Sequence, residues 1–79
     1  MWYVYVIESN TNKFRYVGMS DNPECRLKSH NSGKVKSTKH YKPLRIIYRE
    51  KVGTRVETRK REIYFKSAAG RKYLKMLVE

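Results

Sequence analysis

An unbroken apolar and aromatic run at residues 2–7, Trp-Tyr-Val-Tyr-Val-Ile, constrains the fold more than any other feature. The run is rich in β-branched and aromatic residues, which favour strands. A strand that is apolar on both sides of its pleat is covered on both of its faces. We therefore predict a central strand at residues 2–7, with other elements packed against each face.

Two further strands are predicted around it. A polar cluster at residues 9–12 is typical of a turn, and residues 14–19 then predict a second strand that forms a hairpin with the first. A polar and basic loop over residues 33–42 precedes a third apolar segment, residues 43–50. That segment predicts the third strand of the sheet.

The first helix has a clear start and a clear end. Asn22 is a good N-cap, and Pro23 suits the first helical position, where a missing N–H costs nothing. Gly33 is typical of the residue just beyond a helix C-terminus. We predict a helix over residues 23–31.

Two more helices follow the third strand. Thr54 and Glu57 have the spacing of a capping box, so a second helix is predicted to begin there and to continue to about Lys66. Ser67 can cap a last helix over residues 68–77, although a glycine within that segment lowers its helix propensity.

The element order is therefore β-β-α-β-α-α, which predicts an α+β fold with a small antiparallel three-stranded sheet flanked by helices. The chain has 79 residues, so we expect one domain over residues 1–79. A chain of this length buries only about 60% of its unfolded surface, which leaves a small core.

The charge of the chain indicates the class of its partner. Nineteen Lys and Arg residues against seven Asp and Glu residues give a net charge of +12. Nucleic acid is the expected polyanion, although ribosomal and membrane-surface proteins have a similar balance. Cys25 is the only cysteine, which excludes an intramolecular disulfide. With no apolar run near the length of a membrane span, we expect a cytoplasmic protein without membrane contact.

Two side chains of the first helix are candidates for anion binding. Arg26 and His30 are one turn apart at the margin of the apolar side defined by Leu27. An Arg guanidinium can donate two parallel hydrogen bonds to a phosphate. From this helix alone, the alternative that both are ordinary surface residues is favoured.

A phosphodiesterase usually needs a divalent ion, and that ion needs a carboxylate ligand. Most of the seven acidic residues lie at strand ends, turns, a cap or the terminus, which leaves Glu62 on the second helix, facing the core margin. The alternative is purely structural. Glu62 forms an i,i+4 pair with Lys66, and Arg59 lies three residues before it.

The order of these motifs resembles the GIY-YIG nuclease domain, especially its small single-domain bacterial group. The resemblance rests on Val-Tyr-Val around Tyr5, Tyr-Val-Gly from Tyr16, and the Arg-x-x-x-His pattern of Arg26 and His30. It implies that Arg26 contacts the scissile phosphate, that His30 lies near the attacking water, and that the two tyrosines position or deprotonate that water. Which tyrosine is the base stays open.

The resemblance also implies that Glu62 binds one metal ion, Mg²⁺ or Mn²⁺. Two departures from the family pattern stand out: the first motif lacks the Gly-Ile-Tyr sequence, and no Asn follows Asn31. Separate DNA-recognition modules, which larger members carry, are missing too, so we expect recognition of backbone or branched shape instead of base sequence. This leaves room for a protein partner that supplies substrate recognition.

The sequence thus predicts a metal-dependent endonuclease that cuts DNA in a structure-directed or backbone-directed way, as in repair or recombination. A different class, a nucleic-acid-binding module without useful turnover, is the main alternative, and a structural RNA-associated protein is a third. Lysines suited to tracking a phosphate backbone are Lys34, Lys36, Lys39, Lys42 and Lys66.

Overall fold

The computed structural model of the chain describes residues 1–78. The elements in chain order are β1 (Trp2–Ser9), β2 (Arg15–Ser20), α1 (Pro23–Asn31), β3 (Leu44–Gly53), α2 (Arg55–Lys66) and α3 (Ala68–Val78). This order confirms the predicted α+β fold. None of the helices in residues 1–78 is long and apolar enough to cross a membrane.

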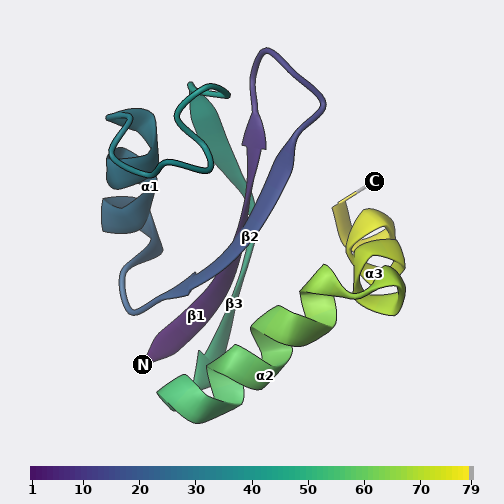
Figure 1. Cartoon of the computed structure of the whole chain (residues 1–79). Helices are drawn as coiled ribbons and strands as arrows, with labels where there is room; N and C mark the ends of the chain where they lie inside the picture. Colours follow the sequence, from purple (N-terminus) through teal and green to yellow (C-terminus); the bar gives the residue numbers. More distant parts are fainter. Residues whose placement is uncertain (79) are drawn as a thin grey trace.

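The three strands form one antiparallel sheet in the order β2-β1-β3, so the apolar strand is central, as predicted. Figure 1 shows α1 on one face of this sheet and the α2–α3 pair on the other. Both faces of β1 are therefore covered, which is why its sequence lacks the polar alternation of a half-exposed strand.

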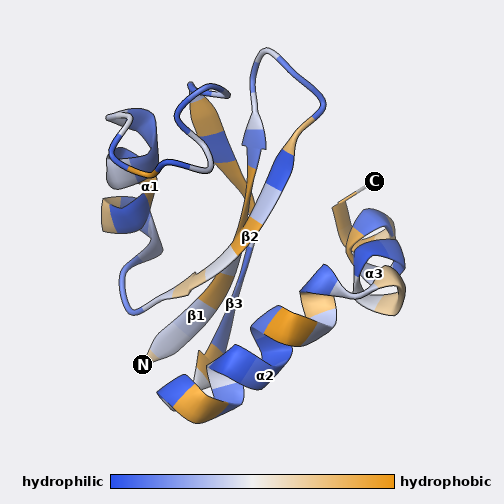
Figure 2. Cartoon of the chain, in the orientation of Figure 1, coloured by the Kyte–Doolittle hydropathy of each residue, from blue (hydrophilic) through white to orange (hydrophobic). Residues whose placement is uncertain are grey.

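Because successive side chains of a strand point to opposite faces, β1 supplies two separate cores. Val4 and Val6 pack with Phe65 of α2 and Leu74 of α3. On the opposite face, Tyr5, Ile7 and Leu44 form a second cluster with partly buried aromatic residues from β2 and the loop before β3. Figure 2 shows the apolar segments concentrated in the strands and on parts of α2 and α3.

Two of the three strands are longer than predicted. Predicted strand 1 ends at residue 7, whereas β1 continues to Ser9, and β3 spans Leu44–Gly53 instead of residues 43–50. The reason is tertiary, because the two strands pair along their whole length, from Trp2 opposite Gly53 to Ser9 opposite Leu44. This pairing holds the polar residues at the end of β3 in the ladder despite their low strand propensity.

The helix starts follow the predicted chemistry. The Asn22 side chain accepts a hydrogen bond from the N–H of Cys25 at 3.2 Å, so Asn22 caps α1. At the start of α2, the Thr54 hydroxyl and the Glu57 carboxylate each accept from the other's backbone N–H, which completes the predicted capping box. These caps fix where α1 and α2 leave the sheet.

The glycine within α3 is explained by a close approach. Gly70 is buried where α2 and α3 meet, and a β-carbon there would collide with the carbonyl oxygen of Tyr64. The Ser67 hydroxyl accepts a hydrogen bond from the Gly70 N–H at 3.1 Å, as expected of a cap. The helix propensity lost at Gly70 is offset by the tight packing of the two helices.

Candidate active site

Tyr5 lies at the centre of the α1 face of the sheet. Its side chain is 1% exposed, and it pairs across the ladder with Gly18 of β2. A β-carbon at Gly18 would lie 2.6 Å from both the Tyr5 hydroxyl oxygen and its Cζ. The missing side chain therefore lets the phenol extend across β2.

His30 of α1 meets this phenol. Its Nε2 lies 2.9 Å from the Tyr5 hydroxyl oxygen, and the ring centroids of His30 and Tyr16 are 5.0 Å apart. The His30 side chain is fully buried, so the alternative that it is an ordinary surface residue is wrong. The packing of α1 against the sheet carries His30 inward together with Leu27. The α1 face thus joins the two motif tyrosines to one histidine.

Thr38 completes the network, and sequence reasoning missed it. Its Oγ1 lies 2.8 Å from Nδ1 of His30, and the residue is fully buried although it belongs to the loop between α1 and β3. The loop was predicted only as a basic surface segment. No periodic pattern marks a single inward residue in such a loop, so the sequence carries no signal for this contact.

Arg26 lies at the exposed rim of the same network. Burial raises the pKa of Tyr5 to about 12, and a hydrogen bond from Arg26 opposes that rise. Burial also lowers the pKa of His30 to about 4, and here the Arg26 charge adds to the effect. Tyr5 and His30 are consequently both neutral at neutral pH, with one permanent cation beside them.

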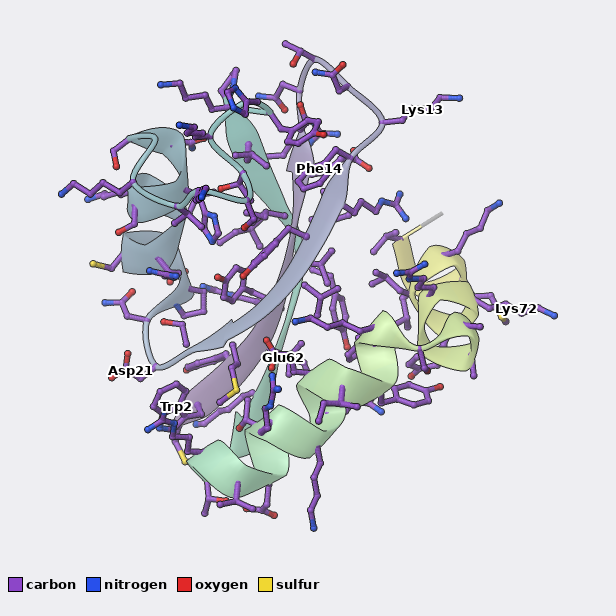
Figure 3. The ribbon with its side chains drawn as sticks, in the orientation of Figure 1. Trp2, Lys13, Phe14, Asp21, Glu62 and Lys72 are labelled. Atoms are coloured by element: carbon purple, nitrogen blue, oxygen red, sulfur yellow. The ribbon has the colours of Figure 1, made fainter. Side chains whose placement is uncertain are left out.

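Glu62 is buried on α2, as predicted, with 6% of its surface exposed. It projects from α2 towards the sheet (Figure 3). Both structural partners foreseen from the sequence are present: Arg59 Nη1 at 2.5 Å and Lys66 Nζ at 3.5 Å. The carboxylate charge also contributes to the raised pKa of Tyr5. This contribution is the smallest of those that act on Tyr5.

An open pocket of about 640 Å³ lies in front of this carboxylate. It is lined by Met19, Arg55, Val56, Arg59, Lys60 and Glu62. Within residues 1–78, no group of three or more His, Cys, Asp or Glu side chains could hold a metal ion. A lone carboxylate beside open space fits Mg²⁺, which keeps several waters and is bound through one or two carboxylates plus substrate phosphate.

A second hollow of about 730 Å³ runs beside β2, and four of its ten lining residues are cations. Its lining residues are Lys13, Phe14, Arg15, Tyr16, Val17, Ser37, Phe65, Lys66, Arg71 and Leu74. It contains Tyr16 of the proposed site and no acidic residue, so it suits a polyanion. Of the predicted nucleic-acid contacts, Lys66 lines this hollow, whereas the four loop lysines are exposed outside its lining.

Comparison with known proteins agrees with this arrangement. Residues 1–74 match the GIY-YIG catalytic domain family. The chain is 35% identical to a UPF0213 protein of Staphylococcus haemolyticus, over 98% of this chain and 94% of that protein. It is also 35% identical to a UPF0213 protein of Syntrophus aciditrophicus, over 95% and 87% of the two chains. With the UPF0213 protein YazA of Bacillus subtilis it shares 34% identity, over 89% and 71%.

No solved structure matches the chain at comparable significance. The family assignment therefore rests on the sequence match and on the motif tyrosines that the fold brings together. GIY-YIG domains are nuclease domains, which implies a nucleic acid substrate, and they generally depend on a divalent metal ion. A match over residues 1–74, together with relatives of similar length, shows that the chain belongs to the GIY-YIG nuclease family.

Proposed function

We propose that the protein is a metal-dependent endonuclease that hydrolyses phosphodiester bonds in DNA and selects its substrate by backbone or branched shape. The proposal is supported above all by the groups that surround the Tyr5 hydroxyl oxygen. This single oxygen is hydrogen-bonded to His30 and interacts with both Arg26 and Glu62. A proton acceptor and a cation thus lie beside this oxygen, and the charge of a carboxylate from the other face of the sheet acts on it more weakly. These are the kinds of group that hydrolysis of a phosphate ester requires.

Arg26 supplies the phosphate contact in this proposal. Its side chain is exposed while its charge acts on the buried phenol and imidazole, so it lies between solvent and the network. A planar guanidinium can donate two parallel, charge-assisted hydrogen bonds to phosphate oxygens. A phosphate bound there would be held against the Tyr5 hydroxyl.

Tyr5 and Tyr16 position the attacking water, and His30 assists them. Tyr5 contacts His30 through a hydrogen bond, whereas Tyr16 contacts it through its ring. A phenol whose pKa is about 12 is a weak base by itself, so it needs a partner that takes its proton as it receives one from water. His30 is the neutral group in reach.

Glu62 would hold the Mg²⁺ or Mn²⁺ ion. When bound, such an ion neutralises charge that develops on the phosphate oxygens and the leaving group. The two cations on Glu62 do not prevent this, because Arg59 and Lys66 have side chains that are 60% and 47% exposed. Because these two side chains are solvent-exposed, both cations can turn from the carboxylate towards substrate phosphates.

The cationic hollow beside β2 gives the nucleic acid a path that passes Tyr16. Lys13 and Arg71, which sequence reasoning missed, line it together with Lys66. Contacts of this kind bind the backbone without reading bases. They support backbone-directed cutting, with binding that weakens steeply as salt rises.

The first test is cleavage of labelled linear duplex, single-stranded and branched DNA with Mg²⁺ or Mn²⁺. Glu62→Gln should bind each substrate as the native chain does but should not cut, because the amide is a poor metal ligand. Glu57→Gln is the matched control on the same helix, since glutamine also serves in a capping box. It should cut at the native rate.

The alternative function gives a different result. A nucleic-acid-binding module would bind with the same salt dependence, while the native chain and both variants would leave every substrate intact in either ion. Cutting by Glu62→Gln at the native rate would remove Glu62 from the mechanism. A preference for folded RNA over all three DNA substrates would point to an RNA-associated role.

A further inference from the structure

A chain of hydrogen bonds links three parts of the fold through the buried imidazole. The Tyr5 hydroxyl of β1 meets Nε2 of His30 at 2.9 Å, and Nδ1 of His30 meets Oγ1 of Thr38 at 2.8 Å. His30 and Thr38 are fully buried, and Tyr5 keeps 1% of its surface exposed. Each hydrogen in the chain therefore needs a protein acceptor.

The Tyr5 end favours one direction of the chain. The permanent charge of Arg26 acts on the phenol oxygen, which favours an arrangement in which the oxygen faces the cation and the phenol hydrogen points away from it. Among residues 1–78, His30 Nε2 is the acceptor that the structure gives this hydrogen. Nε2 therefore carries no hydrogen of its own, and a neutral imidazole of that kind is protonated at Nδ1.

The Thr38 end agrees with this direction. The Nδ1 hydrogen of His30 is donated to Oγ1 of Thr38, and the Thr38 hydroxyl hydrogen has the Val35 carbonyl oxygen 3.4 Å away as its acceptor. The backbone N–H of Thr38 also donates to Val35 O at 3.1 Å, which holds the residue in this turn. No buried side-chain polar atom in residues 1–78 is left without a partner.

We propose that Thr38 is a positioning residue that locks His30 as the Nδ1–H tautomer and so makes Tyr5, instead of Tyr16, the phenol that passes protons to the histidine. The proposal rests on the proposed nuclease function. As the water oxygen forms its bond to phosphorus, a water proton moves to the Tyr5 oxygen while the Tyr5 proton moves to Nε2 of His30. The bond from phosphorus to the leaving oxygen breaks in the same step, and that oxygen takes a proton from solvent. Tyr5 ends unchanged, His30 carries the proton, and the reverse path returns it to solvent.

The wrong tautomer would block this path. With hydrogen on Nε2, the imidazole would present a donor to the Tyr5 oxygen and could not accept its proton. Thr38 is the group that prevents this, although it lies too deep to touch substrate. It acts through His30, in the way that an orienting side chain fixes a catalytic imidazole elsewhere.

The test begins with the tautomer, which NMR reads without any substrate. In the ¹⁵N-labelled full chain, His30 should show a pyrrole-type shift at Nδ1 and a pyridine-type shift at Nε2. His40→Gln removes the second histidine and assigns the signals. Thr38→Val keeps the shape but removes the acceptor, so Nδ1–H should lose its preference, whereas Thr38→Ser should retain it. An Nε2–H tautomer in the native chain would overturn the proposal.

Cleavage supplies the second readout, on the DNA substrate that the native chain cuts best. Thr38→Val should lower kcat by roughly tenfold or more with KM unchanged. A positioned acid–base group contributes roughly 100-fold or more to the rate, and the loss of its orienting partner should remove part of that. Thr38→Ser should restore kcat. An unchanged kcat in Thr38→Val, or an equal loss in Thr38→Ser, would contradict the assignment. If the native chain cuts nothing, the nuclease proposal fails while the tautomer measurement still decides the role of Thr38.

Discussion

The two faces of the sheet are built from the same strand but hold opposite kinds of core. On the α2–α3 face, the buried cluster of Val4, Val6, Phe65 and Leu74 is apolar, and the buried carboxylate of Glu62 lies on the same helix as Phe65. On the α1 face, Tyr5 of β1 contacts a buried histidine, which in turn contacts a buried threonine hydroxyl. One face is a conventional apolar core, and the other is a hydrogen-bonded network with an exposed Arg at its rim.

The difference shows how a chain of 79 residues divides its small core between stability and chemistry. An apolar core tolerates small adjustments of shape, whereas a buried polar network specifies one arrangement and is costly when a single partner is lost. We therefore expect the α2–α3 face to dominate stability. The α1 face, together with Glu62 of α2, should dominate activity, and the α1 face should dominate the response to pH.

The largest effect on stability is expected at Phe65. Its side chain is fully buried in the apolar cluster, so Phe65→Ala should destabilise the fold by about 3–5 kcal/mol through lost transfer energy and a residual cavity. Urea unfolding followed by circular dichroism measures the change. Ile63→Ala on the same helix is the control, because Ile63 is 53% exposed and should cost less than about 0.5 kcal/mol. Equal costs would contradict the packing described for α2.

The second prediction concerns pH and belongs to the α1 face. The pKa of His30 is lowered from 6.5 to about 4, mainly by burial. The unfolded chain thus binds more protons between these values. Stability should be full above pH 6.5 and should fall as pH drops towards 4, with a loss of about 2 kcal/mol at pH 5. Urea unfolding at pH 7.5 and pH 5 measures it.

On the opposite face, Glu50 also has a shifted pKa, but its contribution to stability is lost at lower pH. Hydrogen bonds from Arg61 hold the pKa of Glu50 below its usual 4.5, so its contribution is lost only as pH falls below that value. The two faces can therefore be separated by pH. His30→Gln should abolish the loss between pH 7.5 and pH 5, and His40→Gln should preserve it. If His30→Gln still loses stability between pH 7.5 and pH 5, groups other than His30 cause that loss.

Local signals in the sequence predict most of the fold. The cap at Asn22 and the capping box at Thr54 placed two helices correctly, and the apolar run placed the central strand. Strand ends were predicted less well, because the length of β3 depends on its pairing with β1 and not on its own residues. Propensity cannot contain that information.

The candidate site was foreseen where a helix or a strand carries its residues. His30 was placed at the margin of the apolar side of α1, and Glu62 at the core margin of α2, and both are buried. Thr38 could not be foreseen, because a loop of polar residues has no period that tells an inward side chain from an outward one. Lys13 and Arg71 join the cationic hollow only through the packing of the hairpin near α3.

The smallest effects on stability, and the sharpest comparison, come from two tyrosines on opposite faces. Tyr5 and Tyr48 both have a pKa raised to about 12, first by burial. Tyr5→Phe leaves the buried Nε2 of His30 without its donor and should cost about 1–3 kcal/mol. Tyr48→Phe removes a donor to Glu50, which keeps its hydrogen bonds from Arg61, so about 0.5–1.5 kcal/mol is expected.

Activity should separate these two variants far more than stability does. Tyr5→Phe should abolish cleavage, because the phenyl ring can neither accept a water proton nor pass one to His30, while Tyr48→Phe should cut at the native rate. Unfolding and cleavage measured on the same preparations show whether lost activity exceeds what lost stability explains. If both variants cut equally well, the Tyr5 hydroxyl serves packing alone. The polar core beneath α1 would then contribute to stability alone, as the apolar core does.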